Sequence, residues 1–225
     1  MPRPLAPRTS RARRRPLAAL AAPLLVLLLA LVAAGCSGDD DDVVAEPSEG
    51  ASETDHNEAD VAFAQEMIPH HAQALVMVDM AQGRTTDPEF EQLLEAIRAA
   101  QGPEIEEMAD WLVEWGEEVP ETMRDHARGG GHGGDDESMG ERMEGLDHGM
   151  PGMMGPEELE ELDASADDRF QDMWLTMMID HHEGAIEMAQ DLQQDGQYGP
   201  AIALAESIEE SQTAEIAQME EMLAS

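Results

Sequence analysis

The chain has a single cysteine, Cys36, and no lysine. One cysteine cannot form a disulfide within the chain, and if it is modified no thiol remains for redox catalysis or metal binding. Any bound metal must therefore be held by histidine, methionine or carboxylate groups. Aromatic residues make up only 3% of the sequence, so we expect a core of leucine, isoleucine, alanine and some of the 17 methionines.

Positive charge is scarce after the first 35 residues. Residues 36–225 contain six arginines and all 50 acidic residues, which gives them a net charge of −44. Such a surface repels nucleic acid and attracts cations, so we expect no nucleic-acid partner. The charge names no function by itself, because solubility or salt adaptation accounts for it equally well.

The first 35 residues have the order of an export signal. Six arginines without an acidic residue precede an apolar run, residues 17–34, and small residues precede Cys36. Residues 33–36, Ala-Ala-Gly-Cys, resemble a lipobox, in which Cys36 becomes the lipidated N-terminus of the mature protein. The apolar run is also about long enough to span a bilayer, so an uncleaved anchor is the alternative. We predict a lipoprotein signal peptide over residues 1–35, a lipid anchor on the extracytoplasmic face of the cell membrane, and an acidic disordered tether over residues 36–57.

The remainder contains two copies of one pattern. Residues 60–112 align with residues 171–223 at a constant shift of 111 positions, without a gap. A register unbroken over this length predicts a duplication. The matching pairs are Met67 with Met178, His70 with His181, His71 with His182, Met77 with Met188, Gln101 with Gln212, Glu104 with Glu215, and Met108 with Met219.

Each copy is predicted to form two helices. The first helices cover about residues 58–82 and 167–194, and each ends near a glycine. The second helices begin after Asp87-Pro88 and Gly199-Pro200, where proline occupies an early helical position. No segment alternates as a strand does. The pattern predicts an all-α four-helix bundle over residues 58–225, with repeats at about 58–116 and 165–225.

A different kind of sequence joins the copies. Residues 120–156 have few large aliphatic side chains and include a run of three glycines, so we predict a flexible insertion. It is either a second place that captures copper or a plain linker. Its histidines and methionines are His126, His132, His148, Met123, Met139, Met143, Met150, Met153 and Met154.

Helical spacing gathers histidine and methionine on one stripe of each first helix, because residues three or four apart share a face. A methionine stripe is usually core packing, and a lone buried histidine is usually hydrogen-bonded structure. Two His-His pairs at equivalent positions fit that explanation poorly, since four buried imidazoles would all need partners. The candidate metal ligands are Met67, His70, His71, Met77, Met178, His181, His182 and Met188.

The second helices carry further candidates at matching spacing. Glu104 and Glu215 have three possible roles: they accept hydrogen bonds that orient the histidines, they bind the metal directly, or they are surface acids. The first role is favoured. Met108 and Met219 lie one helical turn further along on the same face. Thioethers select copper, particularly Cu(I), while imidazole also suits Cu(II), zinc and iron, so copper is the predicted metal.

These residues resemble the two signatures of the domain of unknown function 305 (DUF305) family, over about residues 58–225. The signatures are Met67-Ile68-Pro69-His70-His71 and Met178-Ile179-Asp180-His181-His182, with the second-helix pattern of Gln101, Glu104, Met108 and their counterparts. The resemblance implies a ferritin-like four-helix fold. The CopM-like members imply extracytoplasmic copper binding through methionine and histidine, which supports the eight candidate ligands.

The predicted function is that of a copper-binding lipoprotein without catalytic activity, which buffers, sequesters or hands on copper. Its expected partners are the copper ion, the membrane through lipid at Cys36, and either a protein that exchanges copper or a second copy of the chain. A ferritin-like di-iron oxidase is one alternative, although the predicted helices contain no Glu-x-x-His. A metal-independent interaction or stress protein is the other.

Overall fold

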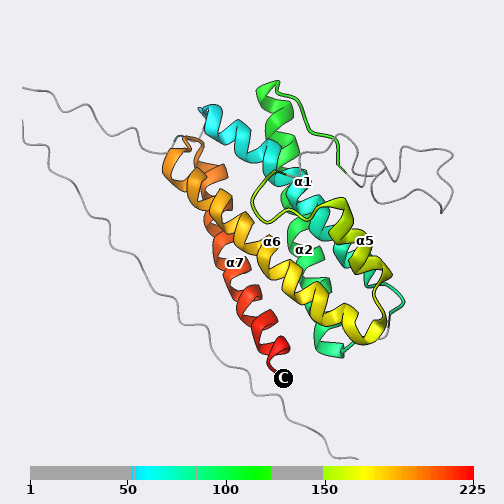
Figure 1. The fold of residues 1–225 in the computed structure, drawn as a ribbon. Coiled ribbons are helices and arrows are strands. Elements are labelled where there is room, and N and C mark those ends of the chain that lie inside the picture. The colour runs from blue at the N-terminus through cyan, green and yellow to red at the C-terminus, as the bar shows by residue number, and fades with distance from the viewer. Residues whose placement is uncertain (1–51, 53, 85, 123–148) are drawn as a thin grey trace, which may run out of the picture. The chain divides into compact units, whose positions relative to one another are not determined.

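The structure, a computed structural model, describes residues 52, 54–84, 86–122 and 149–225 (Figure 1). The predicted signal peptide, Cys36, most of the predicted tether and residues 123–148 of the predicted insertion lie outside the described residues. Within the described ranges, no helix combines the length and the apolar character needed to cross a membrane.

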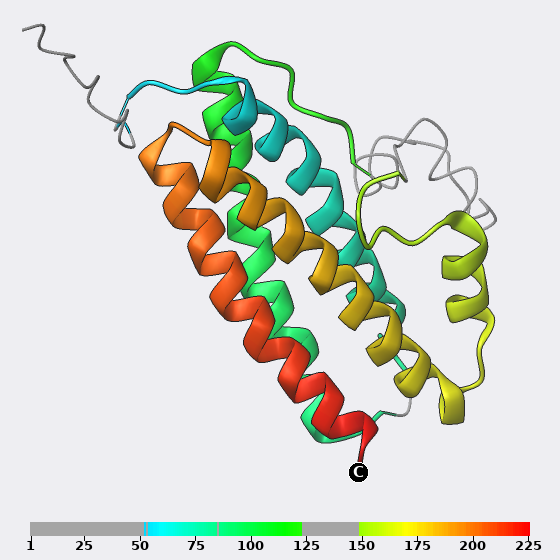
Figure 2. The same cartoon turned by 60° about the vertical axis from the view of Figure 1, so that its left-hand side comes forward.

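Four long helices form two hairpins. Helices α1 (Glu58–Met80) and α2 (Pro88–Trp115) make the first, and α6 (Asp167–Asp195) and α7 (Gly199–Leu223) make the second. Helix α1 also packs on α6 and α2 on α7, and Figures 1 and 2 show α1 and α6 running in opposite directions. The predicted all-α, ferritin-like bundle of two duplicated hairpins is confirmed, with helix ends within about two residues of those expected.

Polar side chains set where the first hairpin begins and turns. The Asn57 side chain accepts hydrogen bonds from the backbone of Ala59 and Asp60, and the Asp60 carboxylate accepts one from the Asn57 backbone, which completes a capping box. The Asp87 side chain caps α2 by accepting a hydrogen bond from the Glu89 backbone, and Pro88 is the first helical residue.

The Asp60 carboxylate also joins the two hairpins. It is fully buried and accepts hydrogen bonds from the backbone nitrogens of Gln197 and Tyr198, at the α6–α7 turn, over 3.1–3.2 Å. Ser52 pairs with the same turn, since its nitrogen donates to the Gln197 carbonyl at 2.7 Å and its carbonyl accepts from Gly199. The end of the predicted disordered tether is therefore fixed to the bundle, through backbone hydrogen bonds that the tether's composition does not reveal.

The core is divided along the helices into two apolar clusters. The first core cluster is built around Phe90, Phe170 and Trp174, and the second around Phe63 and Trp111. Each long helix contributes to both clusters, and between its two contributions lies a set of buried polar residues. We call this set the polar layer; it consists of His70, His71, Gln73, Gln101, His181, His182 and Gln212.

A short segment covers the contact between α1 and α6. Residues 149–155, which we call the strap, lead into helix α5 (Pro156–Ala164), and α5 packs on α6. Met153 and Met154 of the strap are buried, and Leu159 and Leu162 of α5 complete the first core cluster. This part of the insertion was predicted to be flexible and is instead packed, because its partners lie on helices distant in sequence.

The two caps give a matched test of how the hairpins are joined. Replacing Asp60 with alanine leaves buried backbone donors of two hairpins unpaired, so we expect the free energy of unfolding to fall by about 3 kcal/mol. Replacing Asp87 with alanine removes only a cap exposed to solvent and should cost about 1 kcal/mol. Urea denaturation of both variants measures the two values, and equal costs would contradict the joining role of Asp60.

Candidate metal centre

The four histidines of the two sequence copies meet where α1 packs on α6. The rings of His70 and His181 lie with their centroids 3.8 Å apart and their planes tilted by 39°. The ring centroids of His181 and His182 are 6.4 Å apart. All four side chains are buried. The duplication therefore brings equivalent residues together in one interior layer.

One histidine of each pair is oriented by a carboxylate from the neighbouring helix. His71 Nε2 lies 2.8 Å from Glu104 Oε2, and His182 Nε2 lies 2.7 Å from Glu215 Oε2. A carboxylate accepts, so Nε2 carries the hydrogen and Nδ1 keeps a free electron pair, as in the carboxylate–histidine–metal arrangement. Of the three roles considered for these glutamates, this geometry is that of an orienting acceptor.

The other two histidines differ from each other. His70 Nε2 lies 3.0 Å from the carbonyl oxygen of Pro151 in the strap, and because a carbonyl only accepts, the hydrogen again sits on Nε2. Neither ring nitrogen of His181 has a hydrogen-bond partner. The two copies are thus equivalent at His71 and His182 but not at His70 and His181.

Buried polar atoms without partners are concentrated in this layer. In the described ranges there are eight such side-chain atoms, and all belong to six residues of the polar layer. Each such atom costs about 1–3 kcal/mol of folding free energy. A bound ligand or metal ion that paired with these atoms would remove that cost. The atoms are Nδ1 of His70, His71 and His182, both ring nitrogens of His181, both amide atoms of Gln101, and Oε1 of Gln212.

Sequence reasoning included Gln101 and Gln212 in the repeat but not among the site residues. Both are 2% exposed and lie three positions before Glu104 and Glu215, on the same helix faces. Their identity at equivalent positions of both copies was the available signal. Gln73 and Pro151 were not predicted. Gln73 binds the strap at Met154, and Pro151 contacts His70 from within the strap, so both roles depend on where the strap lies.

The methionines flank the polar layer in two equivalent sets. Met67, Met108 and Met188 belong to the second core cluster, and Met77, Met178 and Met219 belong to the first. The shift of 111 positions converts one set into the other. Each cluster therefore holds one methionine from each of the three matched pairs. The structure therefore places these six buried thioethers in the two core clusters, on either side of the polar layer.

Imidazole and carboxylate alone do not complete a metal site. Among the residues that the structure describes, no group of three or more histidine, cysteine, aspartate or glutamate side chains is arranged to hold a metal ion. Zinc and di-iron sites are commonly built from such groups. The other potential donors near the layer are amide groups of Gln101 and Gln212 and the thioethers of the methionines that flank it.

Burial keeps the central histidines neutral. Desolvation, followed by the nearby His71, lowers the pKa of His70 from its usual 6.5 to about 3. The pKa of His181 also lies well below 6.5, first through burial and then through His70. Both rings are unprotonated at neutral pH, which is the form that binds metal.

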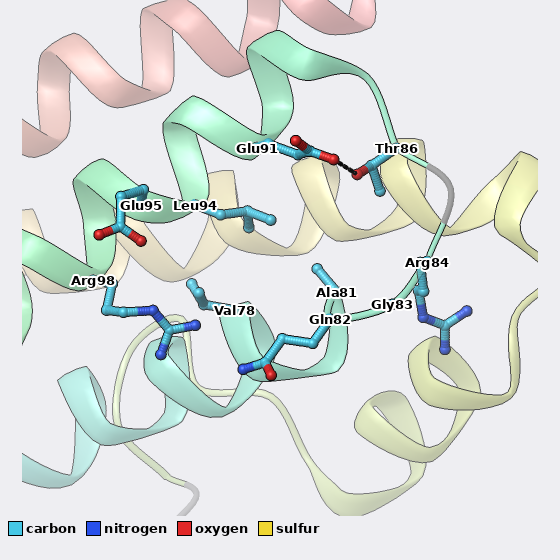
Figure 3. Close-up of a pocket in the computed structure, with 10 residues that line it drawn as sticks. All are labelled: Val78, Ala81, Gln82, Gly83, Arg84, Thr86, Glu91, Leu94, Glu95 and Arg98. Atoms are coloured by element: carbon cyan, nitrogen blue, oxygen red, sulfur yellow. Dashed lines mark hydrogen bonds between the residues drawn. The ribbon is translucent and has the colours of Figure 1, made fainter.

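A separate pocket of about 230 Å³ lies at the α1–α2 turn (Figure 3). No histidine or methionine lines it. Its two arginines are engaged, since Arg84 donates to the carbonyls of Met80 and Ser165 and Arg98 pairs with Asp79 at 2.7 Å. The pocket lacks the donors of the polar layer and is no alternative metal site.

Acid should destabilise the fold through His70 and His181. Below pH 6.5 the unfolded chain gains a proton at each, while folded His70 stays neutral to about pH 3, so folding stability falls as the pH drops from 6.5. At pH 5 the loss from His70 is roughly 2 kcal/mol, and the lowered pKa of His181 adds a loss of the same sign. Free energies of unfolding at pH 7 and pH 5 should therefore differ by at least about 2 kcal/mol more in the wild type than in a His70→Leu, His181→Leu variant. Equal differences would contradict the lowered pKa values.

Solved structures of three other proteins share the fold of this chain. A DUF305 protein from Streptomyces coelicolor is 28% identical and matches with a TM-score of 0.58, over 74% of this chain and 92% of that one. A DUF305 fragment from Deinococcus radiodurans is 26% identical, with a TM-score of 0.58 over 75% and 97% of the two chains. CopM in its Cu(II)-bound form is 30% identical, with a TM-score of 0.56 over 73% and 95%.

None of the curated proteins matches the chain. The family model described as a domain of unknown function, DUF305, matches residues 60–223, which include all four long helices almost completely. The chain belongs to the DUF305 family.

Proposed function

We propose that this protein binds copper in the polar layer of its bundle and buffers, sequesters or hands on the metal without catalysing a reaction. The observation that carries the proposal is the set of unpartnered, buried imidazole nitrogens. Three of the four histidines have Nε2 on an acceptor and Nδ1 without a partner, and six buried methionines flank the layer. Neutral imidazole with thioether is a donor set for Cu(I), and imidazole also accepts Cu(II).

The relatives support the choice of metal. Structures of CopM are described as its Cu(I)-bound, Cu(II)-bound and silver-bound forms. Silver and Cu(I) are both soft ions, the class that thioether ligands select. The Cu(I)-bound form is 27% identical to this chain over 72% of its length.

The place of action follows from the first part of the sequence. We propose a lipid anchor at Cys36 that holds the bundle on the extracytoplasmic face of the membrane, joined by the acidic tether. The acidic residues would concentrate cations near the domain. A partner that delivers or receives copper, or a second copy of the chain, would then meet the bundle outside the membrane.

The first test is a Cu(I) competition titration of residues 37–225. A variant with alanine at His70, His71, His181 and His182 should bind Cu(I) more than about 100-fold more weakly, since even partners that only orient a ligand contribute 10–100-fold. A control variant with alanine at His126, His132 and His148 should bind as tightly as the wild type. Loss of binding in the control alone would move the site to residues 120–156, and no binding by the wild type would refute the copper proposal.

The second test separates the orienting glutamates from the surface charge. Replacing Glu104 and Glu215 with alanine should weaken Cu(I) binding by about 10–100-fold, because the acceptors that fix His71 and His182 are lost. The control replaces the exposed Glu106 and Glu220 of the same two helices, which removes equal charge. Equal weakening in both variants would show that only the negative field matters.

The two alternatives have distinct signatures. Oxygen consumption that depends on iron would indicate a di-iron oxidase. A bundle that binds no metal, and keeps both its stability and a partner after loss of all four histidines, would indicate an interaction protein. Neither alternative accounts for the unpartnered nitrogens.

A further inference from the structure

The strap is held on α1 by a pair of hydrogen bonds. Gln73 Nε2 donates to the Met154 carbonyl at 2.9 Å, and the Met154 nitrogen donates to Gln73 Oε1 at 2.7 Å. Both bonds are buried, and the Gln73 side chain is fully covered. A side-chain amide that pairs with one backbone unit in both directions holds that unit in one position and orientation.

On the opposite side, α6 has a glycine where the strap passes. A Cβ atom at Gly184 would overlap the carbonyl of Pro151 and the nitrogen of Gly152. Glycine inside a helix costs about 1 kcal/mol relative to alanine, so its presence here is explained by the space it leaves. Gly152 itself has φ +73°, and a Cβ there would lie 2.5 Å from the Asp180 carbonyl oxygen. The strap therefore lies directly on the α6 backbone beside His181.

Gln73 and Gly184 are the same position in the two sequence copies, related by the shift of 111. In the first copy this position holds the strap, and in the second it makes room for it. A single segment cannot make the same contacts with both of two equivalent helices. The strap gives His70 a hydrogen-bond partner through Pro151 and gives His181 none.

We propose that the strap is a positioning element for His70, in which the Pro151 carbonyl fixes the ring with its hydrogen on Nε2 and its free Nδ1 in the polar layer. It does for His70 what Glu104 and Glu215 do for His71 and His182, with a backbone carbonyl in place of a carboxylate. Three histidines are thereby fixed by acceptors from three different elements, and the ring nitrogens of His181 have none. The ring positions require no metal, whereas their effect on copper binding rests on the proposed function.

The test is the protonation pattern of the four imidazoles in the metal-free chain, measured by nitrogen-15 NMR. In the wild type, His70, His71 and His182 should each show the Nε2–H form. In a Gly184→Ala variant the strap is displaced, so His70 should lose that pattern and the Met154 amide should exchange faster, while His71 and His182 stay unchanged. Gly102→Ala is the matched control, because a Cβ at that helical glycine meets nothing within 4 Å; all three patterns should persist.

Two results would overturn the positioning role: a wild-type His70 with its hydrogen on Nδ1, or an unchanged His70 pattern after the Met154 amide has become exchangeable. A Gln73→Leu variant repeats the test without a Cβ clash if Gly184→Ala does not fold, and the same loss at His70 is expected.

Cu(I) titration of the same proteins separates the two proposals. If the wild type binds copper, the Gly184→Ala variant should bind about 10–100-fold more weakly than the Gly102→Ala control, and equal affinities would refute an effect of the strap on the site. If the His70 pattern changes as expected but even the wild type binds no copper, the positioning role stands and the proposed function fails.

Discussion

The structure depends on the burial of four imidazoles at one crossing of two helices. An imidazole removed from water needs hydrogen-bond partners or loses stability, and a charged one loses far more. The fold answers this with acceptors from three elements, Glu104 of α2, Glu215 of α7 and Pro151 of the strap. These acceptors satisfy three of the eight ring nitrogens, each an Nε2 atom, while all four Nδ1 atoms and Nε2 of His181 stay unpaired. A bundle that needed histidine only for packing would have little reason to leave the same side of each ring without a partner.

This layer also explains why the apolar core is split. Buried polar groups cannot be mixed freely with apolar side chains, so leucine, isoleucine, phenylalanine and tryptophan gather above and below them in two clusters. Methionine lies at the boundary on both sides, where a flexible and polarizable side chain fits an irregular surface. Packing and metal binding therefore favour the same residue at the same positions. This coincidence is why the methionine stripes alone could not identify a function.

The duplication gives the bundle its symmetry, and the strap removes it. Equivalent residues form equivalent contacts wherever a helix of one copy meets its own partner helix, as His71 with Glu104 and His182 with Glu215 do. Where α1 of one copy meets α6 of the other, the strap lies over both helices. Its chain runs in one direction, so it presents different groups to the two equivalent positions. Gln73 and Gly184 differ for this reason. The result is a site with two matched histidines and two unlike ones.

The sequence by itself determined the helices, the duplication and the four histidines of the layer. Helix periodicity and helix-start signals are local, so Asp87-Pro88, Gly199-Pro200 and the 111-residue shift indicate the bundle without knowledge of the packing. The orienting role of Glu104 could be favoured because helical spacing places it on the face that also carries Met108. Tertiary structure alone decided that the rings of His70 and His181 lie against each other, that Gln101 and Gln212 are buried, and that residues 149–155 are held. His70 and His181 are 111 positions apart and Gln73 and Met154 are 81 apart, whereas composition and periodicity describe only neighbours within a few turns of one helix. The glycine- and methionine-rich strap has little local preference of its own, so its position is set by the helices that it crosses.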